Sequence, residues 1–191
     1  MVMDKVFILR NYKKIISKFG LSYEVIHNHM NDIIKIRAIQ KSDNAIISSI
    51  IKTTLEEFNA AIEGTAYTDK ETDDMFGAYA EEKAIYYVAT LNNQIIAGCG
   101  INPLRGGNTS ICELQKMYMS PKARGRKIGK KLVLQCLDFA KKEGYKQCYL
   151  ETFPNMKAAI TLYEKNGFYK IQQSLGNTSH YSCNVWMLKD L

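Results

Sequence analysis

The chain has 191 residues and a net charge of +7, a length that lets one domain bury its own core. Hydrophobic residues make up 46% and charged residues 24%, and no apolar run reaches the ~18 residues that a membrane-spanning helix needs, so no membrane partner is expected. Five cysteines, with no C-x-x-C pair, argue against a disulfide framework or a cysteine-rich zinc site. They predict a cytoplasmic protein without a metal.

Residues 1–31 are predicted to form a helical extension to a domain over residues 32–191. Apolar residues recur in the extension at helical spacing, and Gly20 can end that helix. The stripe consists of Val6, Leu9, Tyr12, Ile15, Ile16 and Phe19. It packs either on its own domain, which is the simpler expectation, or on a second subunit in a homodimer.

From residue 32 onward, strand and helix patterns alternate. Strands are expected over residues 33–39, 84–90, 94–101, 111–119, 147–153, 168–172 and 183–188. Helices are expected from residue 42 or 43 to 58, briefly after Thr72, from Arg126 towards Gly144, and from a cap at Asn155 to Asn166. Hairpins dominate the middle and helices return between strands in the second half. This order favours an α/β fold with a mixed, mostly antiparallel sheet and helices on both faces.

One stretch carries as much positive charge as the surplus of the whole chain. Its basic residues, with no acid between them, are Lys116, Lys122, Arg124, Arg126, Lys127, Lys130 and Lys131. Most of them lie in a loop between a strand and a helix, where free backbone N–H groups at the positive end of the helix dipole suit a phosphate. Gly125 and Gly129 permit close approach. Neither a Walker A loop nor a three-glycine dinucleotide fingerprint is present.

Two segments carry a family resemblance. Arg124-Gly-Arg-Lys127-Ile-Gly129 is similar to the [QR]-x-x-G-x-[GA] loop of the GNAT (Gcn5-related N-acetyltransferase) family, with Lys127 where glycine is usual. Asn155-Met-Lys-Ala-Ala-Ile-Thr-Leu-Tyr163-Glu-Lys-Asn-Gly-Phe168 is similar to a downstream segment of the same family. The broader likeness covers residues 33–191, and it implies the GNAT fold and acetyl-CoA as co-substrate.

The resemblance implies a role for each residue of the cofactor site. Backbone groups of Met117, Tyr118 and Met119 would follow the pantetheine arm, and Asn155 would lie near the thiol. The pyrophosphate would be held by the loop residues Arg124, Gly125, Arg126, Lys127, Ile128, Gly129 and Lys130. Tyr163 would protonate the leaving sulfur, although core packing is the alternative for this side chain.

The acceptor amine must lose a proton before it attacks, and two glutamates are candidates for the base. Glu113 and Glu151 each lie on a strand that is otherwise apolar, so each is expected to be partly buried with a raised pKa. Each is equally compatible with a structural ion pair. The sequence leaves the choice open, and it also leaves open whether His180 binds substrate or lies in a plain hairpin loop.

The predicted function is acetyl transfer to a primary amine of a small molecule or an amino-acid-like acceptor. A protein or peptide acceptor is the alternative within the same chemistry. A basic nucleic-acid-binding domain or an acyl-CoA sensor without turnover is the alternative outside it. No helix-turn-helix signature or exposed aromatic array supports nucleic-acid binding. Residues 59–82 and 174–182 are expected to select the acceptor.

Overall fold

In the computed structural model of the chain, residues 32–191 are described, and the extension predicted over residues 1–31 lies outside them. The strands are β1 (Ile34–Ala38), β2 (Ile85–Leu91), β3 (Gln94–Pro103), β4 (Ile111–Met119), β5 (Gln147–Thr152), β6 (Tyr169–Ile171) and β7 (Val185–Asp190). The helices are α3 (Asn44–Glu57), α4 (Met75–Ala78), α5 (Ile128–Lys142) and α6 (Lys157–Lys165). Short 3-10 turns occupy Lys41–Asp43, Lys70–Asp73 and Pro121–Ala123. Every strand and helix predicted after residue 32 is therefore present.

The seven strands form one sheet in the order β1-β2-β3-β4-β5-β7-β6. All neighbours are antiparallel except β4 and β5, which are parallel and are connected by α5. The predicted mixed, mostly antiparallel α/β fold is confirmed. The β2–β3 hairpin turns at Asn92 and Asn93, which both have positive φ (50° and 66°), as the tight turn between two strands requires.

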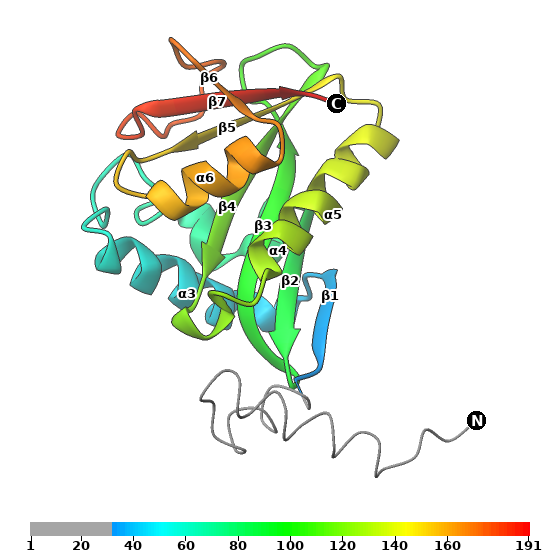
Figure 1. The fold of residues 1–191 in the computed structure, drawn as a ribbon, viewed down its shortest axis with the longest axis vertical. Coiled ribbons are helices and arrows are strands. Elements are labelled where there is room, and N and C mark those ends of the chain that lie inside the picture. Colours follow the sequence, from blue (N-terminus) through cyan, green and yellow to red (C-terminus); the bar gives the residue numbers. More distant parts are fainter. Residues whose placement is uncertain (1–31) are drawn as a thin grey trace, which may run out of the picture.

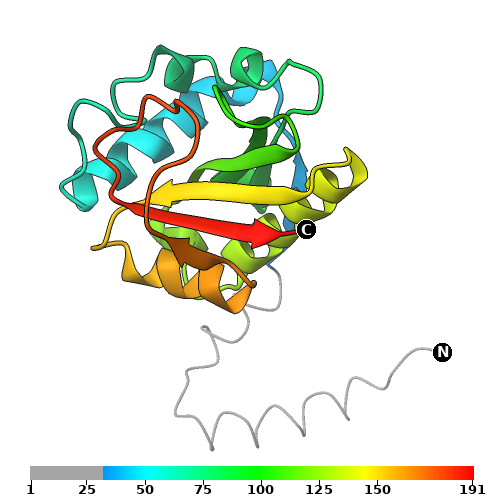
Figure 2. The same ribbon diagram turned by 90° about the horizontal axis from the view of Figure 1, so that it is seen from above.

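Helices cover both faces of the sheet, as Figures 1 and 2 show. The helices α5 and α6 pack on one face over a core that includes Ile128, Leu132 and Cys136. The helices α3 and α4 pack on the other face over a second core that includes Ile47, Ile51 and Met75. The sheet thus has two buried faces. The strands β4 and β5 separate near the centre of the sheet, and the candidate site lies at this separation.

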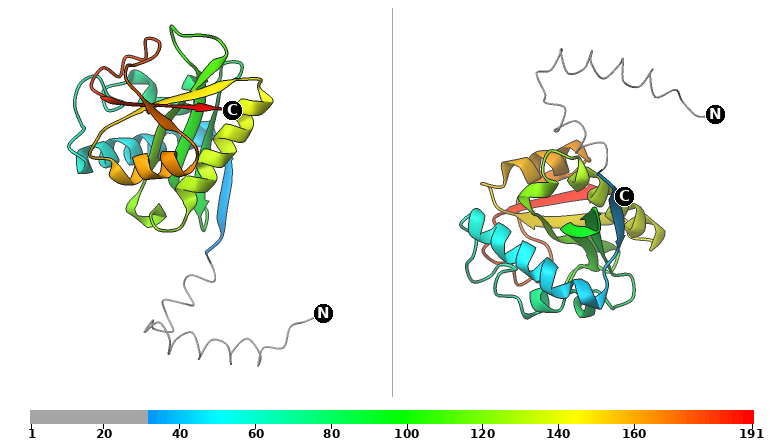
Figure 3. Two further views of the ribbon diagram at one scale, coloured as in Figure 1. Left: turned by 45° about the horizontal axis from the view of Figure 1, so that its top comes forward. Right: turned by 90° about the horizontal axis from the view of Figure 1, so that it is seen from below.

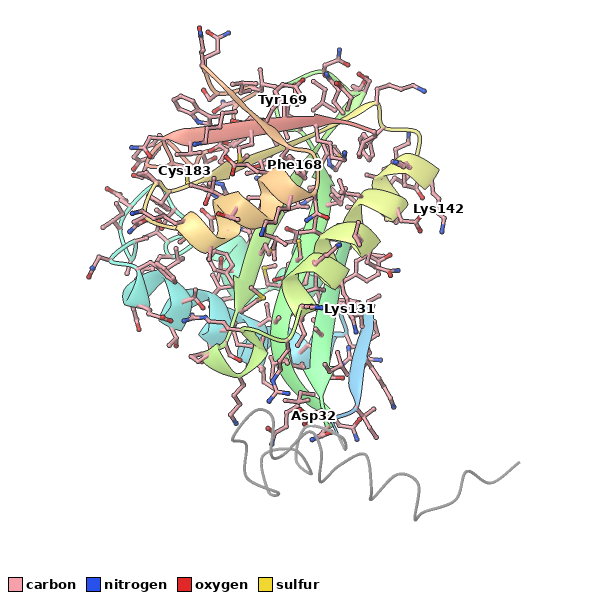
Figure 4. All side chains as sticks on the ribbon, in the orientation of Figure 1. Asp32, Lys131, Lys142, Phe168, Tyr169 and Cys183 are labelled. Atoms are coloured by element: carbon pink, nitrogen blue, oxygen red, sulfur yellow. The ribbon has the colours of Figure 1, made fainter. Side chains whose placement is uncertain are left out.

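The sequence of α5 explains its position. Ile128, Leu132, Cys136 and Ala140, the predicted stripe, are all fully buried, whereas Lys142 on the opposite side is exposed. Figure 4 places Lys131 near the start of this helix and Lys142 near its end.

In residues 32–191 no helix is long and apolar enough to cross a membrane. All five cysteines lie in this range and are free.

Candidate active site

A bulge in β4 opens the sheet at its centre. Lys116 has a φ of +49°, and the β3–β4 register shifts between Gly98 and Gly100. The pairing of β4 with β5 extends only from Ile111–Gln147 to Glu113–Tyr149. Beyond that point the two strands diverge, so the backbone of residues 117–119 faces a gap instead of a neighbouring strand. An extended ligand can pair with such an edge.

The loop between β4 and α5 has the geometry of an anion cradle. Gly125 has a φ of +73°, and a Cβ there would have no heavy atom within 4 Å, so the space above it is open. Within residues 32–191 no carbonyl accepts, by geometric criteria, from the backbone N–H groups of Gly125 and of residues 127–130, which lead into α5. Lys127, at the position where the family has glycine, adopts the left-handed conformation (φ 60°, ψ 15°). A glycine adopts this conformation without strain, whereas the lysine bears a local strain of about 1 kcal/mol.

The positive charge of this stretch is divided among different partners. Lys116 points away from the loop and pairs with Asp69. Arg124 donates to both oxygens of Glu57 at 2.5 Å, and Arg126 pairs with Asp32. Among the described residues, no carboxylate pairs with the exposed lysines of the loop, which are Lys122, Lys127, Lys130 and Lys131. Three of the seven cations of this stretch therefore pair with carboxylates of other elements.

A groove of about 480 Å³ extends from this loop along β4 to the start of α6. Figure 1 and the left view of Figure 3 show the start of α6 beside the end of α3, and residues of both helices line the groove. Seven predicted site residues line it: Met117, Tyr118, Met119, Arg124, Gly125, Asn155 and Tyr163. Ile128 and Gly129 are buried in α5 and can contribute only their backbone.

Asn155 does not cap α6, contrary to the prediction. The helix begins at Lys157, its N-cap position is Met156, and no side chain caps it. The Asn155 Nδ2 atom instead donates to the carbonyl oxygen of Phe58 at 2.9 Å. This bond crosses the groove from the α6 side to the end of α3, so Asn155 holds the two walls together.

Tyr163 lies at the inner end of the groove. Its ring packs edge-on against Phe168 with centroids 5.9 Å apart, and its hydroxyl donates to the Met117 sulfur at 3.5 Å. Burial raises the pKa of the Tyr163 phenol well above its ordinary value of 10, and this keeps the phenol protonated. The ring of Tyr163 is therefore part of the core, and its hydroxyl borders the groove.

Glu113 is a buried carboxyl at the point where β4 and β5 separate, with 2% of its surface exposed. Its Oε2 accepts from Gln115 Nε2 at 2.6 Å, and Gln115 Oε1 accepts from the Tyr79 hydroxyl at 3.2 Å. Burial raises the pKa of Glu113 to about 7, although the Gln115 bond and nearby positive charges oppose the rise. A pKa near neutral suits a group that must accept a proton at physiological pH.

Glu151 lies on β5 and is half-buried. Its Oε1 accepts from the Tyr149 hydroxyl at 2.7 Å and from Thr178 Oγ1 at 2.9 Å. Glu151, Glu113 and Tyr163 line one cavity of about 60 Å³, which shares Met117 and Tyr163 with the long groove. The structure thus brings all three predicted catalytic side chains to one place. Figure 4 shows Cys183, which also lines this cavity, beside the start of β7.

Three side chains join the two segments expected to select the acceptor. Asp69 accepts from the Lys116 ammonium and lies 2.9 Å from His180 Nε2. Burial pushes the pKa of Asp69 up, but these two partners outweigh it and bring the pKa to about 2. The Lys116 side chain is only 2% exposed. Residues 59–82 and 174–182 are therefore fastened to the middle of β4.

Asp69 and Gln115 were not among the predicted site residues, and the ion pair of Lys116 was not predicted. No motif marks the first two. One signal was available for Lys116: a lysine within an apolar strand is buried, and a buried lysine needs a carboxylate partner. The partner is 47 residues away in the chain, so only the tertiary structure identifies it.

Comparisons with known proteins point to one class, the acetyltransferases. The model of the "Acetyltransferase (GNAT) family" matches residues 50–168. YjgM, an uncharacterised N-acetyltransferase of Escherichia coli (strain K12), is 38% identical over 156 residues, which cover 81% of this chain and 93% of YjgM. The chain therefore belongs to the GNAT acetyltransferase family, and the predicted family and enzyme class are confirmed.

Solved structures show the same fold at lower identity. A GNAT acetyltransferase from Staphylococcus aureus Mu50 has a TM-score of 0.70 and 21% identity, with 83% of this chain and 99% of that chain covered. The PaiA N-acetyltransferase from Thermoplasma acidophilum, in complex with coenzyme A, has a TM-score of 0.61 and 20% identity over 83% and 99%.

Proposed function

We propose that this enzyme transfers the acetyl group of acetyl-CoA to a primary amine of a small molecule, by direct attack while both substrates are bound. The observation that carries the proposal is that two spaces adjoin. The long groove beside the anion cradle and the cavity that holds Glu113 and Glu151 share Met117 and Tyr163 in their walls. Acetyl-CoA supplies an acetyl group activated as a thioester.

The residues of the groove fit this co-substrate. The backbone N–H groups of residues 125–130 and the exposed lysines suit a pyrophosphate, and the open space above Gly125 allows close approach. The apolar side chains of Met117, Met119 and Leu162 suit a pantetheine chain. PaiA, which shares the fold, binds coenzyme A. We therefore assign the pyrophosphate to the loop and the pantetheine arm to β4.

The inner cavity holds a base and an acid. An amine with a pKa of ~10.4 is mostly protonated at neutral pH. Glu113, with a pKa of about 7, accepts that proton, and Glu151 orients the ammonium before transfer. The protonated Tyr163 donates to the leaving sulfur, and the Met119 N–H is the candidate donor to the oxyanion.

The size of the inner space supports a small acceptor over a protein. The cavity around Glu113 has a volume of about 60 Å³. A second cavity, which shares Lys116 and His180 with it, has a volume of about 180 Å³. Both are smaller than the ~300–1,000 Å³ typical of pockets for drug-sized ligands.

Glu113→Gln and Glu151→Gln test the assignment of the base. In the wild type, kcat/KM measured by release of coenzyme A should rise with pH through an apparent pKa near 7. Glu113→Gln should lower it ~10²–10⁴-fold and remove that rise, because an amide cannot accept the proton. Glu151→Gln should keep the rise.

The same variants provide a folding control. An ionised Glu113 is unfavourable in the folded protein because its pKa is raised, so Glu113→Gln should melt no lower than the wild type at pH 8. Retention of the alkaline rise in Glu113→Gln would contradict the assignment. If no amine releases coenzyme A, the proposed function is wrong.

A further inference from the structure

A second cavity adjoins the cavity that holds Glu113 and Glu151. It has about 180 Å³ and shares three residues with the cavity around the glutamates: Gln115, Lys116 and His180. Its remaining lining residues come from the 3-10 turn region, from Arg105 after β3 and from the loop before β7: Asp69, Lys70, Glu71, Arg105, Thr178 and Ser179. A polar cavity, called the outer cavity below, therefore lies next to the cavity that contains Glu113.

The two ends of this space differ in charge. The inner end holds Glu113 and Glu151. The acids of the outer end are already neutralised, since Asp69 has two basic partners and Glu71 pairs with Arg105. The charge left without a counter-charge among the lining residues is the ammonium of Lys70.

Two outer cations retain unused hydrogen-bond donors. Lys70 is exposed and pairs with no carboxylate of residues 32–191. Arg105 uses one side-chain nitrogen on Glu71, so the rest of its five N–H donors remain available. The pKa of Arg105 is raised, first by the Glu71 bond and further by the charges of Glu71, Glu81 and Glu113, so its guanidinium lies in the field of the buried base.

The backbone holds Arg105 at the rim of the outer cavity. Its carbonyl oxygen accepts from the Asn177 N–H at 2.7 Å, which fastens it to the loop that carries Thr178 and His180. Figure 2 shows that loop lying over the same side of the sheet as the segment between α3 and α4. The guanidinium itself donates from one nitrogen to Glu71 and is half exposed, and a guanidinium presents a planar fork of donors that matches a carboxylate.

We propose that the acceptor is a small zwitterion, a primary amine that also carries a carboxylate, as a free amino acid does. Its amine lies at Glu113 and Glu151, and its carboxylate lies at Arg105 and Lys70. This inference rests on the proposed function and specifies its substrate class.

The test compares acceptors that differ only in the carboxylate. Coenzyme A release is measured with free α- and ω-amino acids, with their carboxamides and with the amines that lack the carboxyl group. The acids should have kcat/KM values ~10–100-fold above their carboxamides, as a charge-assisted hydrogen bond to the carboxylate implies. Arg105→Gln and Lys70→Gln should each raise KM for the acids more than they lower kcat, and they should leave the carboxamides unchanged.

Lys142→Gln on the far end of α5 is the matched control, because it removes an exposed cation that lines neither cavity; it should leave all acceptors unchanged. The Arg105 side chain is 53% exposed, so its loss should not prevent folding, and Lys70 forms no ion pair with residues 32–191 that could be lost. Equal rates for acids and carboxamides would overturn the inference and leave acetyl transfer intact. Binding of acetyl-CoA without coenzyme A release from any acceptor would overturn the proposed function, and the inference with it.

Discussion

The hydroxyl of Tyr163 donates to a sulfur, not to an oxygen. Its partner is the Met117 thioether at 3.5 Å, and such a bond is weak. Little energy is therefore lost when the hydroxyl turns to another sulfur that enters the groove. Because burial raises the pKa of this phenol, it remains a proton donor throughout the neutral range.

Tyr163→Phe should lower kcat ~10–100-fold with little change in the dissociation constant of acetyl-CoA, since only the proton donor is removed. Tyr145→Phe is the control, because that buried hydroxyl donates to the Lys83 carbonyl oxygen and does not line the groove. Stopped-flow or steady-state coenzyme A release measures both variants. An unchanged kcat in Tyr163→Phe would leave this residue with a packing role only.

At the scale of elements, the junction of β4 and α5 forms the anion site. A Cβ atom at Gly129 would lie 3.0–3.3 Å from side-chain atoms of Met117, Leu162 and Met119. The absence of a side chain at this position therefore allows close packing of α5 against these residues. Gly125 faces open space instead and lines the groove.

Gly125→Glu should raise the dissociation constant of acetyl-CoA at least ~10-fold, because it places a carboxylate where phosphates would lie. Gly144→Glu is a matched control: Gly144 also has a positive φ (+85°) and no neighbour within 4 Å, but it ends α5 away from the groove. Both variants should lose a similar ~1–2 kcal/mol from backbone strain. Equal acetyl-CoA affinity, measured by calorimetry, would contradict the position of the cradle.

The Asp69 cluster connects three elements, and its contribution to stability depends on pH. The pKa of Asp69 is about 2, below the ~3.9 of an unfolded aspartate, so its ionised form stabilises the fold above about pH 4. That contribution is lost as the pH falls from about 4 to about 2.

Asp69→Asn should therefore destabilise the protein by about 2–4 kcal/mol at pH 7, since it leaves the buried Lys116 ammonium without a counter-charge. The difference from wild type should shrink at pH 3. Asp73→Asn, which breaks the exposed pair with Lys52, should cost less than about 1 kcal/mol at either pH. Urea denaturation at both pH values measures these differences, and a pH-independent loss would contradict the ionic role.

For the whole molecule, ligand binding to the native state should appear as thermal stabilisation. Acetyl-CoA at ~100 times its dissociation constant adds ~2.7 kcal/mol, which raises the melting temperature of a chain this long by roughly 5–10 °C. ATP and a short DNA duplex are the controls. A shift with DNA but none with acetyl-CoA would contradict the proposed ligand.

The sequence alone was enough to predict the order of the elements, the mixed sheet and the family. These depend on local periodicity and on two motifs in which neighbouring residues act together, as in the loop around Gly125 and the helix that carries Tyr163. It also indicated the two glutamates, because a carboxyl in an apolar strand stands out locally.

The tertiary structure shows which of these residues contact one another. It separated Lys116 from the other cations and paired it with Asp69 and, through Asp69, with His180. It replaced the cap expected at Asn155 with a bond to Phe58, and it gave Glu113 a burial that the half-buried Glu151 lacks. These features depend on contacts between residues far apart in the chain, and the sequence has no local signal for which distant residue becomes the partner.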